Sequence, residues 1–181
     1  MVIIGASLML VQALRMFSFG IFLKPITAEF GWGRGDLSSA YAIAMFVSGF
    51  LAILSGRICD KYGPRFLVTF AGLCVAAGFV LMSRIQTVWH VQLVWGLFMG
   101  AGGSLFFIPI TSTIARWFVK KRGLAVALTA SGFSLGGVVT APLCQYLIDG
   151  YGWRNAYLVM SVMAVIFTVP LAQFLKHSPE R

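Results

Sequence analysis

The sequence has little charge, and acidic residues are the scarcest part of it. Only 10% of the 181 residues are charged, with five Asp or Glu against fourteen Lys or Arg, whereas 59% are hydrophobic. A soluble domain of this size needs more polar surface to cover its core. The shortage excludes a soluble globular domain and predicts that a lipid bilayer surrounds much of the chain.

Cysteine and histidine are also rare, and their spacing forms no chemical site. The three cysteines, Cys59, Cys74 and Cys144, stand in no CxxC or Cys/His metal pattern. His90 and His177 have no acidic residue at catalytic spacing, and no GxSxG, Walker A or HExxH motif occurs. We therefore expect no metal, no cofactor and no enzymatic activity.

Most of the sequence consists of long apolar stretches. A membrane-spanning helix needs about 20 mostly apolar residues. Strand-like alternation is missing, and a helix satisfies its own backbone hydrogen bonds in lipid. The sequence therefore predicts an all-α membrane protein, one bundle over residues 1–181, with transmembrane helices at residues 2–23, 37–55, 66–83, 91–115, 123–148 and 156–175.

Glycine and proline punctuate the predicted connections between these stretches. We interpret them as turns between helices rather than as a linker between domains. The residues concerned are Pro25, Gly31, Gly33, Gly35, Gly63, Pro64, Gly150 and Gly152.

The net charge of +9 is spread over short basic clusters between the apolar stretches. This distribution argues against a nucleic-acid surface, which needs one basic patch. Because basic residues concentrate in cytoplasmic loops, the richer side predicts that both termini are cytoplasmic. That side holds Arg57, Lys61, Arg65, Arg116, Lys120, Lys121, Arg122, Lys176 and Arg181, and the other side holds Lys24, Arg34, Arg84 and Arg154.

Arg15 is the one charged residue inside a predicted span. A charge at this depth costs about 2.5–3.5 kcal/mol on insertion scales, so it is a candidate for function. Gln12 lies beside it, and a guanidinium offers a fork of donors to a carboxylate. One interpretation is a binding site for an anionic substrate, and the other is a side chain that snorkels outward or pairs structurally with another helix.

Other polar residues within the spans are weaker candidates. Tyr41 on the second stretch is a candidate for substrate contact. Hydroxyls in membrane helices more often bond the backbone of their own helix than line a path. The hydroxyl residues are Thr111, Ser112, Thr113, Thr129, Ser131, Ser134 and Thr140.

Glycine pairs predict close helix packing. Gly132 and Gly136 form a GxxxG pattern on the fifth stretch, and Gly96 and Gly100 do so on the fourth. Such pairs let two helix backbones approach closely.

The segment at residues 56–65 joins the second and third stretches. Its Asp60 can pair with Arg116 or sit at a helix N-terminus. The order of glycine, three residues, Asp, a basic residue, one residue, glycine and further basic residues resembles the signature loop of the major facilitator superfamily. The matching residues are Gly56, Asp60, Lys61, Gly63 and Arg65.

That resemblance implies a role for Asp60 in latching the two halves of a transporter in one state, with Arg116 and the loop taking part. Pro64 stands where many relatives have a basic residue. The alternative is an ordinary solvated basic loop.

A second stretch of the sequence resembles a smaller group of proteins within that superfamily. Residues 116–125 show an aromatic pair, a basic triplet and Leu-Ala, and residues 130–137 add Ser-Gly and paired glycines. These features resemble monocarboxylate transporters and oxalate/formate antiporters, as do residues 22–32 and 149–154. Gly96 replaces an Arg of many superfamily members, and Val138 replaces the proline that follows glycine in drug/proton antiporters, which argues against multidrug efflux.

The resemblance implies a protein of two six-helix halves with its site between them. We expect this chain to be the N-terminal half, a fragment or truncated product without the C-terminal half. The implied function is secondary active transport of a small organic anion with a proton or by exchange, in a bacterial inner membrane. The alternatives are another substrate, such as a drug or sugar, and a non-transporting membrane scaffold.

Overall fold

The computed structural model describes residues 2–118 and 120–175, and these are helical with short connections. The prediction of an all-α protein is confirmed. The helices are α1 (Val2–Phe30), α2 (Arg34–Tyr62), α3 (Pro64–Met82), α4 (Val88–Leu93), the π-helical segment η1 (Val94–Met99), α5 (Gly100–Trp117) and α6 (Arg122–Gln173).

Five helical rods in this part of the chain are long and apolar enough to cross a membrane. One of them, Val88–Trp117, consists of α4, η1 and α5 in continuous succession. The separate helices predicted for residues 123–148 and 156–175 are not separate here, because both lie in α6. The number of helices therefore differs from the six that the sequence predicted.

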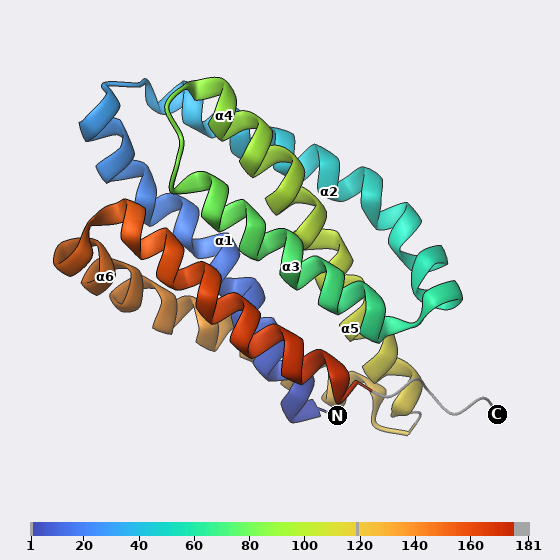
Figure 1. The fold of residues 1–181 in the computed structure, drawn as a ribbon. Helices are drawn as coiled ribbons and strands as arrows, with labels where there is room; N and C mark the ends of the chain where they lie inside the picture. The colour runs from blue at the N-terminus through green and yellow to red at the C-terminus, as the bar shows by residue number, and fades with distance from the viewer. Residues whose placement is uncertain (1, 119, 176–181) are drawn as a thin grey trace.

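Gly152 divides α6 into two limbs, residues 122–151 and 153–173. Its φ of 78° and ψ of 157° are not helical, and Figure 1 shows the chain folding back on itself within α6. A straight helix of 52 residues would be about 78 Å long, against a hydrocarbon core of about 30 Å. The two predicted stretches thus correspond to the two limbs.

Several helix ends differ from the predicted ones. Pro25 does not end the first helix but lies inside α1, which continues to Phe30. Gly35 lies in the first turn of α2 rather than in a loop. Apolar length alone misses these extensions, because a helix continues past the apolar region until its backbone is interrupted. The interruption after α1 is Gly31, with a φ of 67°.

The predicted loop at residues 56–65 is mostly helix. Gly56, Asp60 and Lys61 belong to the last turns of α2, and Arg65 belongs to the first turn of α3. Only Gly63, with a φ of 81°, leaves the helical conformation. The connection is thus a one-residue turn, which fixes the ends of α2 and α3 relative to each other.

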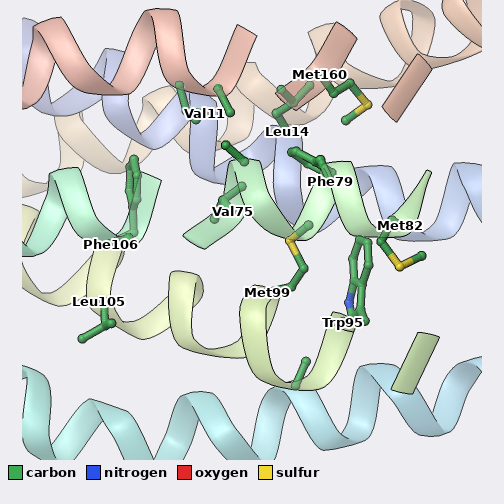
Figure 2. Packing of buried hydrophobic residues seen from close by; sticks show 14 of the residues in the cluster. Val11, Leu14, Val75, Phe79, Met82, Trp95, Met99, Leu105, Phe106 and Met160 are labelled. Atoms are coloured by element: carbon green, nitrogen blue, oxygen red, sulfur yellow. The ribbon is translucent and has the colours of Figure 1, made fainter. Parts of the chain in front are cut away.

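The bundle has two packing groups. The helix α1 packs mainly against both limbs of α6, which also packs against α3, whereas α2 packs mainly against α5 and η1. Figure 1 shows α2 and α6 at opposite edges. In Figure 2, Phe79 of α3 lies on the side of Leu14 and Met160, and Met99 and Trp95 lie on the opposite side of α3. In lipid, such complementary packing holds helices together because the hydrophobic effect does not.

The predicted packing glycines lie where neighbouring helices come close. A Cβ on Gly132 would be 2.3 Å from the carbonyl oxygen of Ala6, and one on Gly136 would be 2.5 Å from the Cβ of Ala13. On the rod formed by α4, η1 and α5, a Cβ on Gly100 would be 2.9 Å from the carbonyl oxygen of Ala44. At Gly96 the nearest atom would be Cγ2 of Ile43, at 2.5 Å.

Candidate functional site

Arg15 lies inside the bundle, between α1 and the rod formed by α4, η1 and α5. It is only 4% exposed, which excludes a side chain that snorkels into lipid or headgroups. Its Nε donates to Oε1 of Gln12 at 3.1 Å, and its Nη1 donates to the carbonyl oxygen of Met99 at 2.8 Å. Gln12 in turn donates to the carbonyl oxygen of Gly103 at 3.3 Å. Of the predicted site residues, Gln12 is therefore the one in contact with Arg15.

Side chains of other helices bind backbone carbonyl groups at or next to the π-helical segment η1. A π-helix replaces the regular i→i+4 backbone bonds with i→i+5 bonds, and such segments often occur at functional sites. Three carbonyl oxygens at or just beyond η1 accept hydrogen bonds from side chains of other helices. Met99 accepts from Arg15 and Gly103 from Gln12, while Gly100 accepts from Oγ of Ser48 on α2 at 2.6 Å.

The charge of Arg15 has no acidic partner among the residues that the structure describes. The ion pairs found there join Arg116 to Asp60 and Arg154 to Glu29. A hydrogen bond to a charged group contributes about 1.5–3 kcal/mol, so the two bonds of Arg15 can offset the insertion cost of about 2.5–3.5 kcal/mol. The fold can thus hold Arg15 at this depth, and its positive charge stays uncompensated by protein acids.

Tyr41 lies beside this group without bonding to Arg15. Its ring packs against Phe19, with centroids 5.5 Å apart. It lines a hollow of about 430 Å³ together with Met16, Gly20 and Ser38. The hollow is lined by residues of α1 and α2, and Arg15 is not among its described lining residues.

Most of the predicted hydroxyls bond their own helix. Thr111 donates to Phe107, Thr129 to Ala125 and Thr140 to Gly136, each to the carbonyl group four residues earlier. The hydroxyl protons of these residues are therefore used within their own helix. Ser48, which bonds to another helix, was not among the sequence candidates.

A second group of polar residues joins the ends of α2 and α5. Asp60 and Arg116 form an ion pair of 2.7 Å, with both side chains more than half exposed. Of the two predicted arrangements, pairing with Arg116 is therefore the one observed. Arg65 at the start of α3 also donates from Nε to the carbonyl oxygen of Leu175.

The other end of the bundle carries a third group. Glu29 at the end of α1 pairs with Arg154 at 2.9 Å and accepts a hydrogen bond from the indole nitrogen of Trp153. The Arg154 guanidinium lies over the rings of Trp153 and Phe30, at 4.7 and 5.8 Å from their centroids. The second limb of α6 is thus tied to α1 at this end.

The chain is similar in sequence to known membrane transporters. The chain matches the family model of the Major Facilitator Superfamily over residues 5–181. It is 32% identical over 148 residues to monocarboxylate transporter 13 of Bos taurus, covering 82% of this chain and 35% of that protein. It is also 27% identical over 154 residues to the oxalate:formate antiporter of Oxalobacter formigenes, covering 83% and 37%.

The fold has a solved counterpart. The inward-open conformation of the xylose transporter XylE from E. coli matches with a TM-score of 0.80 at 15% identity, covering 98% of this chain and 48% of that one. The chain spans about a third of the length of the curated relatives it matches. With helices fit to cross a membrane and the family match over almost its whole length, this chain belongs to the major facilitator superfamily, a family of transporters and not of enzymes.

Proposed function

We propose that this chain forms one half of a carrier for a small organic anion, and that Arg15 binds the anion's carboxylate. The single observation that carries the proposal is the buried guanidinium of Arg15, held by two neutral acceptors and by no acidic residue of the described chain. A buried charge without a counter-charge is stabilised by any anion that reaches it. A carboxylate also matches the planar fork of the guanidinium.

The names of two relatives support the substrate class. One is a monocarboxylate transporter and the other an oxalate:formate antiporter, so both names refer to small carboxylates. Tyr41 is proposed to contact the substrate, because it lines a hollow formed by residues of α1 and α2. A coupling proton, or exchange of one anion for another, stays a prediction.

The conformational cycle is assigned to the group around Asp60. We propose that its ion pair with Arg116, together with Gly56, Lys61, Gly63 and Arg65, holds the ends of α2 and α5 in one state of the cycle. An exposed pair contributes about 0–1 kcal/mol, which suits a contact that must break and re-form in each cycle.

The arrangement in the membrane completes the proposal. The two limbs of α6 and the other four rods cross the bilayer six times, with the Asp60 end and both termini in the cytoplasm. A second six-helix half completes the carrier, since alternating access needs two bundles that move against each other. Location in a bacterial inner membrane stays a prediction, because the relatives include animal proteins.

The anion site can be tested by equilibrium dialysis of the purified chain in detergent against [¹⁴C]oxalate and [¹⁴C]lactate. We expect Arg15→Gln to weaken binding by at least about 30-fold, because removing one partner of a buried charge pair costs about 2–5 kcal/mol. The matched control is Arg34→Gln, an exposed arginine at the start of α2. Equal affinity in the Arg15 variant and the wild type would refute the proposed site.

Uptake by vesicles tests whether transport requires a second six-helix half. Vesicles containing only this chain should take up neither anion against a gradient, whereas vesicles with the chain joined to a second six-helix half should do so. Concentrative uptake by the chain alone would show that one bundle suffices. Binding without uptake in both preparations would favour a non-transporting scaffold.

A further inference from the structure

The Arg15 guanidinium uses two of its three nitrogens in hydrogen bonds within the described chain. Nε is used by Gln12 and Nη1 by Met99. No hydrogen bond among the described residues uses Nη2. Its N–H groups are therefore donors that no described protein group uses, because a guanidinium carries five N–H groups in a fixed plane.

Nη2 is buried against Gly103 on α5. A Cβ built on Gly103 would lie 2.9 Å from Nη2 and 3.2 Å from Cζ of Arg15, and 3.1 Å from Oγ of Ser48. Two side chains from two other helices thus converge on the one point where residue 103 has no side chain. Ser48 donates its proton to Gly100, so its position is fixed as well.

The glycines on this rod differ in what an added methyl group would meet. At Gly100 the nearest atom is a backbone oxygen, that of Ala44, and at Gly102 it is Cγ2 of Val75. At Gly103 the nearest atoms are the far ends of two polar side chains. A methyl group at residue 103 would therefore displace the guanidinium instead of separating two helices.

We propose that Gly103 is a positioning residue for Arg15: because residue 103 has no side chain, the guanidinium can lie in the orientation in which it binds the substrate carboxylate. This inference rests on the proposed anion site. Gly103 acts by leaving the space in which Nη2 lies, while Gln12 holds Nε and Met99 holds Nη1. A guanidinium held in one orientation presents its unused donors in a defined direction, which lowers the ordering needed on binding.

Binding of [¹⁴C]oxalate and [¹⁴C]lactate to Gly103→Ala tests the inference. We expect a loss of affinity of about tenfold, since small misplacements of a binding group have effects of this order or larger. The control is Gly49→Ala on α2, where no atom lies within 4 Å of the added Cβ. The same substitution in an Arg15→Gln background should have no further effect, because residues that act through one contact are not additive.

Each outcome separates this inference from the function on which it rests. A wild-type chain that binds neither anion overturns the proposed function. A chain that binds, and binds equally well as Gly103→Ala, overturns only the positioning role. The positioning role is also overturned if Gly103→Ala weakens anion binding in the Arg15→Gln background by the same factor as in the wild-type chain.

A measurement on the unaltered chain covers the case in which Gly103→Ala does not fold. In chain labelled with ¹⁵N-arginine, the signals of Arg15 are identified by their loss in Arg15→Gln. Added oxalate or lactate should shift the Nη signal of Arg15 and leave its Nε signal, bonded to Gln12, nearly unchanged. A shift confined to Nε would show that the anion does not bind the Nη donors of a guanidinium held in this orientation, and would overturn the inference.

Discussion

The carboxylate of Asp60 on α2 lies 2.7 Å from Nη2 of Arg116 on α5. The two residues are far apart in sequence, and each stands in the last turns of its helix. A carboxylate at a helix C-terminus is unfavourable on its own, whereas an arginine there is favourable. Their pairing therefore compensates Asp60 for its position and links two helices at one end of the bundle.

Replacing Asp60 with Asn tests whether this pair serves movement or stability. Because both side chains are more than half exposed, the free energy of unfolding should change by no more than about 1 kcal/mol. Anion uptake by the chain joined to a second half should fall about fivefold, the effect of about 1 kcal/mol on a conformational equilibrium.

The control for Asp60→Asn is Asp149→Asn, whose carboxylate accepts a hydrogen bond from Gln145 on the same helix. The exchanged pair Asp60→Arg with Arg116→Asp should recover part of the uptake. Unchanged uptake in Asp60→Asn, or an equal loss in Asp149→Asn, would contradict the gating role.

Glu29 is the centre of the contacts at the other end. Glu29→Ala removes both the ion pair with Arg154 and the acceptor for the Trp153 indole, and should lower the free energy of unfolding by about 1–2 kcal/mol. Glu29→Gln keeps an oxygen for the indole and should lose less. Unfolding by SDS titration in mixed micelles gives these values. Arg34→Ala is the control at the same end, and an equal loss there would show that charge alone matters.

The sequence was sufficient for the helical class and for the apolar stretches, because a bilayer sets both composition and length. It also indicated that Arg15 is a candidate functional residue, since a charge inside a membrane span is rare. Helix ends were less predictable. Pro25 is tolerated inside α1, and the segment before Gly63 continues as helix, because neither glycine nor proline has to end a helix within a packed bundle.

Of the two partners of Arg15, Gln12 was indicated by the sequence, but Met99 could not be, because it contributes a backbone carbonyl group. The π-helical segment that precedes Gly100 has no known residue pattern by which to find it, and Met99 offers only its main-chain oxygen. The dense glycines at 96, 100, 102 and 103 were a signal for close approach. They did not reveal that Gly103 faces a guanidinium while Gly100 faces a helix backbone.

Gly132 should be essential for the packing of α1 against α6. Gly132→Ala would place a methyl group 2.3 Å from the backbone oxygen of Ala6, an atom that moves only with its helix. Overpacking of this kind costs about 1–3 kcal/mol. SDS titration should show that loss, and Gly20→Ala, where no atom lies within 4 Å, should show no loss, since alanine is the better helix former. Similar values for both variants would contradict close packing at Gly132.

Gly152 should be required for the reversal between the two limbs of α6. Its φ of 78° with ψ of 157° is a conformation almost restricted to glycine, and holding another residue there costs about 1–3 kcal/mol. Gly152→Ala should therefore weaken the contact between the limbs. The matched control is Gly150→Ala, because residue 150 is helical and has no atom within 4 Å of an added Cβ.

A thiol gives a direct measure of that contact. Cys144 on the first limb is fully buried, and its Sγ lies 3.8 Å from Sδ of Met160 on the second limb. In a chain with Cys59 and Cys74 replaced by Ser, a membrane-permeant maleimide should label Cys144 slowly. Gly152→Ala should speed the labelling because it opens the limbs, whereas Gly150→Ala should leave the rate unchanged. Equal rates in all three proteins would mean that the limbs stay paired without the glycine, and that other contacts, such as those of Glu29 with Trp153 and Arg154, set the reversal.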